Sequence, residues 1–242
     1  MQIDIWSDVA CPWCFIGKRR FERALGAWEH REEVEVTWHS YQLDPGLPGH
    51  YDGTEAEYLA ERKGMPVAQV REMFQHVTQQ AAGEGLAYDF DALVVANSLR
   101  AHQLLHLAKS HEQPGAADAV KDALLSAHFE RGIDIGDVDA LVDIGAGAGL
   151  DEQEIRAALA DERHLPAVRA DIAQAQELGV TGVPFFVFDM RLGLSGAQPA
   201  EVFAQALDQA RASALQETVP STSDPAQGRP AQGRRAQGRR AT

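Results

Sequence analysis

The chain has 242 residues, 45% of them hydrophobic, which is enough for one principal domain with an insertion and too little for several large domains. Its 36 acidic and 22 basic residues give a net charge of -14, which argues against nucleic acid and anionic membranes as partners. Because no apolar run reaches the ~18 residues of a membrane span and the first residues lack the pattern of a secretory signal, the sequence predicts a cytoplasmic protein.

The first elements along the chain have the patterns of a strand, a helix and a second strand. Residues 2–6 alternate polar and apolar side chains, as a strand does. From Cys14 onward, Phe21 and Trp28 recur at helical spacing, which predicts a helix running to about Trp28 with these side chains on one face. Residues 34–38 alternate again and predict the second strand.

The middle of the chain, residues 54–178, has almost no strand pattern and predicts a segment of several helices. Helical periodicity is clearest in three stretches, 91–110, 116–131 and 166–178. Two glycine-rich breaks interrupt the segment, and Asp137 and Asp151 follow them at positions typical of helix caps.

The pattern changes twice more toward the C-terminus. Residues 185–188 form an apolar run that predicts a strand, with 190–194 as its hairpin partner and 199–215 as a last helix. From Glu217 the sequence consists largely of Pro, Ser, Gly, Gln and Arg, a composition that buries too little apolar surface to fold.

These patterns divide the chain into three parts. We expect one domain to be formed by residues 1–53 together with 179–215. Residues 54–178 are the expected helical insertion in that domain, and residues 216–242 are the expected disordered basic tail.

The two cysteines of the chain, Cys11 and Cys14, are separated only by Pro12 and Trp13. Two cysteines placed at random in a chain of this length have this spacing about once in 120, so the spacing favours dithiol redox chemistry. Cys11 falls at the expected start of the helix, where free N–H groups and the helix dipole favour a thiolate, and it is the expected nucleophile. Cys14 lies one turn later on the core-facing side and is the expected resolving thiol.

Other interpretations of these features compete. The cysteines are alternatively small core residues, whereas a zinc site would need further ligands that the spacing of the nine histidines does not supply. Asp8 either relays a proton or caps the helix start. Asn97 and His102 either line a small-molecule cleft or make structural hydrogen bonds. A proline at position 184, before a strand, is also compatible with an ordinary edge turn.

Three segments together resemble the thioredoxin superfamily, most closely its DsbA-like branch in the cytoplasmic group typified by FrnE: Ser7 to Gly17, Asn97 to His102 and Gly179 to Pro184. The resemblance covers about residues 1–215. It implies an α/β class protein with a thioredoxin fold that contains a long all-helical insertion.

The resemblance also implies a set of site residues. Cys11, Cys14 and Pro184 would form the catalytic site, with a cis peptide bond between Val183 and Pro184 facing the cysteines. The backbone of Val183 would pair with a bound polypeptide as an added strand. The remaining residues implied to contact substrate are Pro12, Trp13 and Thr181.

The function implied by the resemblance is that of a thiol–disulfide oxidoreductase or isomerase, which requires no metal and no organic cofactor. Its substrates would be thiols or disulfides, polypeptides among them. The same branch includes kappa-class glutathione transferases and 2-hydroxychromene-2-carboxylate isomerases, so one alternative is a glutathione-dependent isomerase or transferase acting on an aromatic small molecule, with glutathione as co-substrate. A second alternative is a non-catalytic thioredoxin-fold binding module. The direction of exchange and the oligomeric state do not follow from the sequence.

Overall fold

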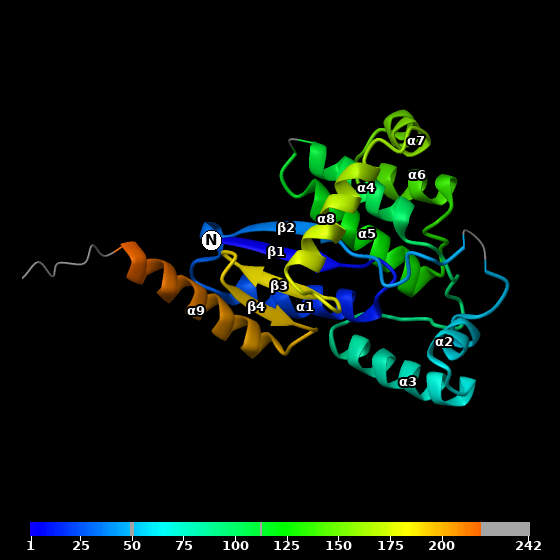
Figure 1. Ribbon diagram of the computed structural model, residues 1–242, viewed down its shortest axis with the longest axis horizontal. Coiled ribbons are helices and arrows are strands. Elements are labelled where there is room, and N and C mark those ends of the chain that lie inside the picture. The colour runs from blue at the N-terminus through cyan, green and yellow to red at the C-terminus, as the bar shows by residue number, and fades with distance from the viewer. Residues whose placement is uncertain (49–50, 112, 219–242) are drawn as a thin grey trace, which may run out of the picture.

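The computed structural model describes residues 1–48, 51–111 and 113–218, and it contains a central sheet with helices on both faces and a group of helices beside it (Figure 1). Within these ranges the sheet has four strands: β1 (Gln2–Ser7), β2 (Glu35–Ser40), β3 (Phe185–Phe188) and β4 (Leu192–Ser195). The α-helices are α1 (Pro12–Ala27), α2 (Glu55–Lys63), α3 (Val67–Gly83), α4 (Leu99–Ser110), α5 (Ala116–Arg131), α6 (Val138–Gly147), α7 (Glu152–Ala160), α8 (Leu165–Glu177) and α9 (Ala200–Thr218). No helix of the described residues is long and apolar enough to cross a membrane.

The strand order is β2-β1-β3-β4, so the sheet contains two strands from the N-terminal part of the chain and two from the C-terminal part. β1 and β2 are parallel, since α1 carries the chain back across the sheet between them. β3 pairs with β1 in the antiparallel direction, and β4 pairs with β3 in a hairpin. The predicted strand-helix-strand start and the predicted hairpin followed by a helix are therefore confirmed, and α2 to α8 lie between them.

Helices cover both faces of the sheet, and neighbouring residues of β1 point to opposite faces (Figure 1). Ile5 packs in one core cluster with Phe21 of α1 and Phe203 of α9. Trp6 belongs to a different cluster, together with Ala175 of α8. α1 and α9 therefore cover one face, and α8 covers the other.

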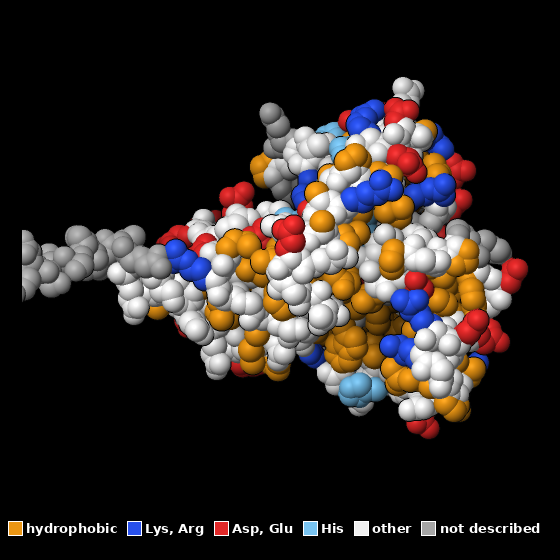
Figure 2. All heavy atoms as spheres, in the orientation of Figure 1, with side chains coloured by type: hydrophobic (Ala, Val, Ile, Leu, Met, Phe, Trp, Pro, Cys, Tyr) orange, Lys and Arg blue, Asp and Glu red, His pale blue; other side chains and the backbone are white. Residues whose placement is uncertain are grey.

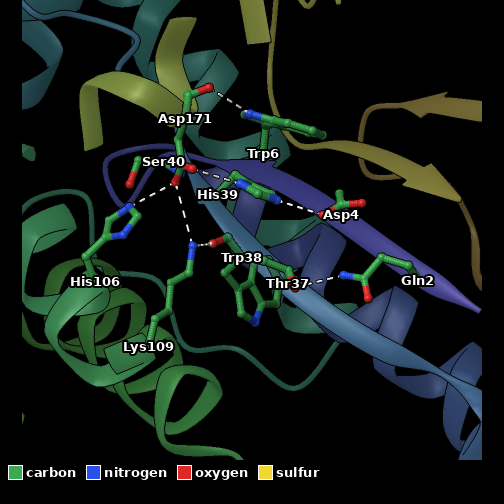
Figure 3. Close-up of polar contacts among 10 residues, drawn as sticks. All are labelled: Gln2, Asp4, Trp6, Thr37, Trp38, His39, Ser40, His106, Lys109 and Asp171. Carbon is green, nitrogen blue, oxygen red and sulfur yellow. Dashed lines mark hydrogen bonds and ion pairs between the residues drawn. The ribbon is translucent and has the colours of Figure 1, made fainter. Parts of the chain in front are cut away.

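A buried carboxylate joins the sheet to the helices on the α8 side (Figure 3). Asp171 of α8 lies 2.9 Å from the Nδ1 atom of His39 on β2 and 2.9 Å from the Nε2 atom of His106 on α4. The backbone N–H of Ser40 donates to the same carboxylate at 2.8 Å, and the Nζ atom of Lys109 lies 3.8 Å away. One side chain thus holds β2, α4 and α8 together.

Most of the predicted helices are confirmed with close bounds. The predictions at 116–131 and 166–178 correspond to α5 and α8. Asp137 accepts a hydrogen bond from the backbone N–H of Ala140 at 2.8 Å, and Asp151 accepts one from Glu154 at 2.9 Å, so both are the predicted caps.

The helix predicted at 91–110 is wrong over its first part, because α4 begins only at Leu99. Near both ends of the stretch before α4, side chains accept hydrogen bonds from backbone N–H groups, and such bonds compete with the formation of a helix. The Asp89 carboxylate accepts from the backbone N–H of Asp91 and of Ala92, each at 3.1 Å, and Asn97 Oδ1 accepts from Leu99 at 2.9 Å. The stretch before α4 is therefore irregular, although its periodicity resembles that of a helix.

The predicted bounds of two strands also need correction. β2 was predicted at 34–38 and lies at Glu35–Ser40. The hairpin partner was predicted from 190 onward, but β4 begins at Leu192. Asp189 and Met190 form the tight turn instead, with φ values of 47° and 54°, and the backbone N–H of Arg191 donates to the carbonyl of Phe188 across it at 3.0 Å.

The predicted tail at 216–242 overlaps the last helix. α9 extends to Thr218, so the first residues of the predicted tail are helical. Residues 219–242 lie outside the described residues, and the prediction for them remains a prediction. The proposed domain boundaries also remain predictions, although the described part of 54–178 contains helices and no strand.

Candidate active site

The cysteine pair lies at the N-terminal end of α1, as the sequence predicts. Cys11 is the N-cap residue with an extended backbone, and Pro12 is the first residue of the helix. The backbone N–H of Cys14 donates to the carbonyl of Cys11 at 3.0 Å. Both thiols are reduced and buried, with Cys11 4% and Cys14 1% exposed.

The loop before β3 faces this pair. The peptide bond between Val183 and Pro184 is cis, and the Sγ atom of Cys11 lies 3.6 Å from the carbonyl oxygen of Val183, where a thiol can donate to it. The conformation and the position implied by the resemblance are thus present. Thr181 is exposed, and its side chain makes no hydrogen bond within the described part of the chain, so its contact with substrate stays a prediction.

Gly17 allows this loop to approach α1 closely. A Cβ atom at Gly17 would lie 2.9 Å from the Cγ atom of Pro184 and 3.4 Å from the Cβ atom of Ala197. The proline ring is rigid and buried, so a side chain at this position would push the loop away from the helix.

We therefore predict that Gly17→Ala is destabilising, although alanine is usually the better residue within a helix. The expected loss is about 1–3 kcal/mol of the free energy of unfolding, the usual cost of overpacking. Gly26→Ala, in the same helix and with no atom within 4 Å of the added Cβ, is the matched control and should be neutral or stabilising. Urea unfolding of both variants measures the two effects, and equal stability of the two variants would contradict the proposed close packing.

A cavity of about 390 Å³ opens beside Cys11, between the start of α1 and the helices α2 and α3. Pro12 and Trp13 line it together with Cys11, whereas Cys14 does not. Figure 2 shows hydrophobic side chains gathered in a hollow on this side of the molecule. The other apolar residues of its wall include Met73, Phe74, Val77, Phe90, Val95 and Phe129. Cys11 is thus the sulfur that a bound molecule can reach.

The ionisation of the two thiols is linked by a hydrogen bond between them. That bond and burial raise the pKa of Cys11 well above its usual value. Burial also acts against ionisation of Cys14, but the hydrogen bond from Cys11, the charge of Lys121 and the Ser7 hydroxyl together lower the pKa of Cys14. The ionisation of the pair therefore depends on these neighbours as well as on the start of the helix.

Asp8 holds two loops beside the cysteines. Its carboxylate accepts from the backbone N–H of Leu43 at 2.7 Å and of Ala10 at 3.2 Å, and it lies 3.2 Å from the Nε2 atom of His102. Burial opposes its ionisation, but the hydrogen bond with His102 lowers the pKa of Asp8, while burial lowers the pKa of His102. Asp8 is therefore a carboxylate that accepts from a neutral His102.

Asn97 makes structural hydrogen bonds, one of the two roles considered for it. Its Nδ2 atom donates to the carbonyl of Leu47 at 2.8 Å, and its Oδ1 atom accepts from Gln42 at 3.1 Å and from the start of α4. His102 is fully buried against Asp8. Neither side chain lines the cavity beside Cys11.

Two residues near the pair were missed in the sequence. The Tyr88 hydroxyl donates to the carbonyl of Pro12 at 2.7 Å, and Lys121 of α5 is completely buried and its charge lowers the pKa of Cys14. Lys121 precedes Leu125 by one helical turn, so it lies on the apolar stripe of α5. A lysine on such a stripe is the signal that would have identified it.

Comparison with known proteins identifies a family and a solved structure that are similar to this chain. Residues 2–208 match the family described as the DSBA-like thioredoxin domain. The chain is 42% identical to a probable DsbA oxidoreductase from Streptomyces coelicolor, with a TM-score of 0.83, covering 98% of this chain and 100% of that chain.

Two more distant structures share the fold alone. A 2-hydroxychromene-2-carboxylate isomerase is 13% identical with a TM-score of 0.64, covering 90% of this chain and 100% of that one. The cytosolic disulfide reductase DsbM from Pseudomonas aeruginosa, in its structure with GSH, is 19% identical with a TM-score of 0.57, covering 90% and 100% of the two chains.

Proposed function

We propose that this chain, which belongs to the DSBA-like thioredoxin domain family, is a thiol–disulfide oxidoreductase that cycles Cys11 and Cys14 between dithiol and disulfide. The observation that supports this most is the position of Cys11. Its sulfur faces the carbonyl of Val183 and lines a cavity, while Cys14 lies behind it, within reach of the same sulfur but not of the cavity. This arrangement suits a nucleophile and a resolving thiol.

The reduction of a substrate disulfide proceeds in two exchanges. Cys11 loses its proton and attacks one substrate sulfur as a thiolate, so that a Cys11–substrate disulfide forms and the other substrate sulfur leaves as a thiolate. Cys14 then loses its proton and attacks the Sγ atom of Cys11, which releases the second substrate thiolate. The cysteine pair loses two electrons, and the two leaving thiolates take up two protons. Oxidation of a dithiol substrate is the same sequence in reverse.

Polypeptides are the proposed substrate class, in the cytoplasm, with glutathione as the candidate co-substrate that restores the dithiol. An extended segment bound along the Val183 backbone would place its sulfur at Cys11, with Thr181 at the edge of this binding surface. Pro12 and Trp13 would contact the residues beside the substrate sulfur, and an apolar neighbour would enter the cavity.

The cavity supports one alternative function. Its aromatic wall also suits a small aromatic molecule, which is what a glutathione-dependent isomerase or transferase would bind beside Cys11. The two functions make different demands on the sulfurs, because only dithiol exchange requires both Cys11 and Cys14.

The test combines a redox titration with an activity assay. In glutathione buffers of varied ratio, the wild type should form the Cys11–Cys14 disulfide in one two-electron transition, measured by mass spectrometry after alkylation. It should also catalyse the reduction of insulin, and Cys11→Ser should reduce that rate to the uncatalysed background. A cysteine pair that forms no disulfide in this titration would instead support a non-catalytic binding module. Activity that survives in Cys11→Ser, with glutathione-dependent isomerisation of an aromatic compound, would support the alternative function.

A further inference from the structure

His128 of α5 is a buried histidine that lines the cavity beside Cys11. Its side chain is 2% exposed, and its Nδ1 atom is buried without a hydrogen-bond partner among the described residues. The other two buried histidines in this part of the chain are His102 and His106, and each has a carboxylate within 3.2 Å of its Nε2 atom. Because an unpaired polar atom is costly in the interior, the position of His128 points to a ligand with a polar atom in the cavity.

The wall of the cavity favours a flat apolar ring. It runs from Met73, which is 40% exposed, to residues that are almost completely buried. Much of it is aromatic, and the rings belong to Trp13, Phe74, Phe90 and Phe129. Such side chains attract another ring in offset or edge-to-face contact. The buried polar residues of the wall, apart from the cysteine, are Asp8, Ser98 and His128. The ligand that fits is therefore an aromatic ring with one polar atom.

The polar atom is expected to be uncharged. Asp8 is the charged residue that acts on the His128 ring, and it would repel a carboxylate bound there. Burial lowers the pKa of His128 to about 4, although Asp8 and the backbone of Ile133 act in the opposite direction, so the imidazole is neutral at pH 7. The same burial disfavours a cationic ligand. A hydroxyl fits, because it can donate to a neutral imidazole or accept from it.

We propose that the cavity selects polypeptide substrates that have a tyrosine beside the reactive cysteine, and that His128 is the specificity-determining residue, which forms a hydrogen bond with the tyrosine hydroxyl. This inference rests on the proposed function, in which the substrate sulfur lies at Cys11 and a neighbouring side chain enters the cavity. The tyrosine ring packs against the aromatic wall, and its hydroxyl pairs with the imidazole. A phenylalanine fills the same space but leaves the imidazole unpaired, so it binds more weakly.

Two synthetic peptides test this preference. In one of them a cysteine is flanked on both sides by tyrosine, in the other by phenylalanine, and each cysteine forms a disulfide with the coloured thiol 5-thio-2-nitrobenzoate. When Cys11 attacks the peptide sulfur, a Cys11–peptide disulfide forms and the coloured thiol, the better leaving group, departs as a thiolate. At low peptide concentration the wild type should react about fivefold faster with the tyrosine peptide, the effect of one neutral hydrogen bond.

Variants at position 128 show whether the histidine causes the preference. His128→Leu should react equally fast with the two peptides, because it removes both ring nitrogens and keeps an apolar side chain. His128→Gln returns a polar group to the position and should recover part of the preference for tyrosine. His128→Met replaces the leucine variant if that variant does not fold.

A binding measurement separates this inference from the proposed function, because it requires no reaction of the cysteines. Trp13 lines the cavity, so tryptophan fluorescence can follow the binding of N-acetyltyrosine amide and of N-acetylphenylalanine amide. The wild type should bind the tyrosine amide about fivefold more tightly than the phenylalanine amide. His128→Leu should bind the two amides with equal affinity.

His76→Leu is the matched control, because this exposed histidine lies 6.3 Å from Trp13, measured between ring centres, but does not line the cavity. It should keep the preference for tyrosine in both assays. Equal or undetectable binding of the two amides by the wild type, or a preference that persists in His128→Leu, would overturn the role of His128. A preference in binding without any release of the coloured thiolate would instead refute the proposed function alone.

Discussion

Replacing Cys14 with serine is expected to leave the protein covalently attached to its substrates, with multiple turnover abolished. Cys11 lines the cavity and still attacks a disulfide, but the buried position behind it no longer holds a thiol that can release the mixed disulfide. Mass spectrometry of non-reduced adducts, from cells that express the variant, measures the trapped fraction and identifies the trapped partners.

Cys11→Ser is the matched control for this experiment. Its remaining thiol at Cys14 is 1% exposed and does not line the cavity, so few adducts or none should form. Equal trapping by both variants, or trapping by neither, would refute the assigned roles of the sulfurs.

Asp171→Ala is expected to lower the free energy of unfolding by about 3–5 kcal/mol, because it leaves several buried hydrogen-bonding groups unpaired at about 1–3 kcal/mol each. The variant leaves the facing nitrogens of His39 and His106 and the backbone N–H of Ser40 without their shared acceptor. Urea unfolding measures the loss. The control is Asp139→Ala, which removes an exposed carboxylate paired with Arg156 and should leave stability nearly unchanged.

The Asp171 contribution should also depend on pH in a defined direction. Burial opposes ionisation of this carboxyl, but hydrogen bonds from His106 and His39 hold the pKa of Asp171 well below its usual value. A lowered folded pKa stabilises the fold above the unfolded value of about 3.9, and the contribution is lost as the pH falls below that value. The stability difference between wild type and Asp171→Asn should therefore shrink from about pH 5 to about pH 3. A constant difference would contradict this account.

The secondary structure near the cysteines followed from local patterns. The alternation of residues 2–6 and the helical spacing from Cys14 to Trp28 reflect burial on one face, which a sequence displays directly. The irregular stretch before Leu99 was not predictable in this way, because the buried residues Leu93 and Ala96 are three positions apart and mimic helical periodicity, while side-chain hydrogen bonds fix the backbone.

The candidate site was predictable only in part, for a physical reason. The spacing of Cys11 and Cys14 is local, and the resemblance supplied the cis peptide before Pro184. The charge balance of the pair depends instead on Lys121, which is distant in sequence and reaches the site only through the packing of α5 against α1. The residues around the pair therefore show the effect of the helix start on Cys11, but not the effect of Lys121, whose charge lowers the pKa of Cys14.

The pairing of β1 with β3 has a consequence for the synthesis of the chain. β1 ends at Ser7 and therefore leaves the ribosome long before its antiparallel neighbour, which begins only at Phe185. At about 5–20 residues per second, roughly 10 to 35 s pass before that neighbour is made. During this interval β1 has only β2 to pair with, so its other edge stays unpaired, and the apolar face around Ile5 is covered by α1 but not by α9. Nascent or truncated chains that end before β3 therefore expose a strand edge that favours aggregation.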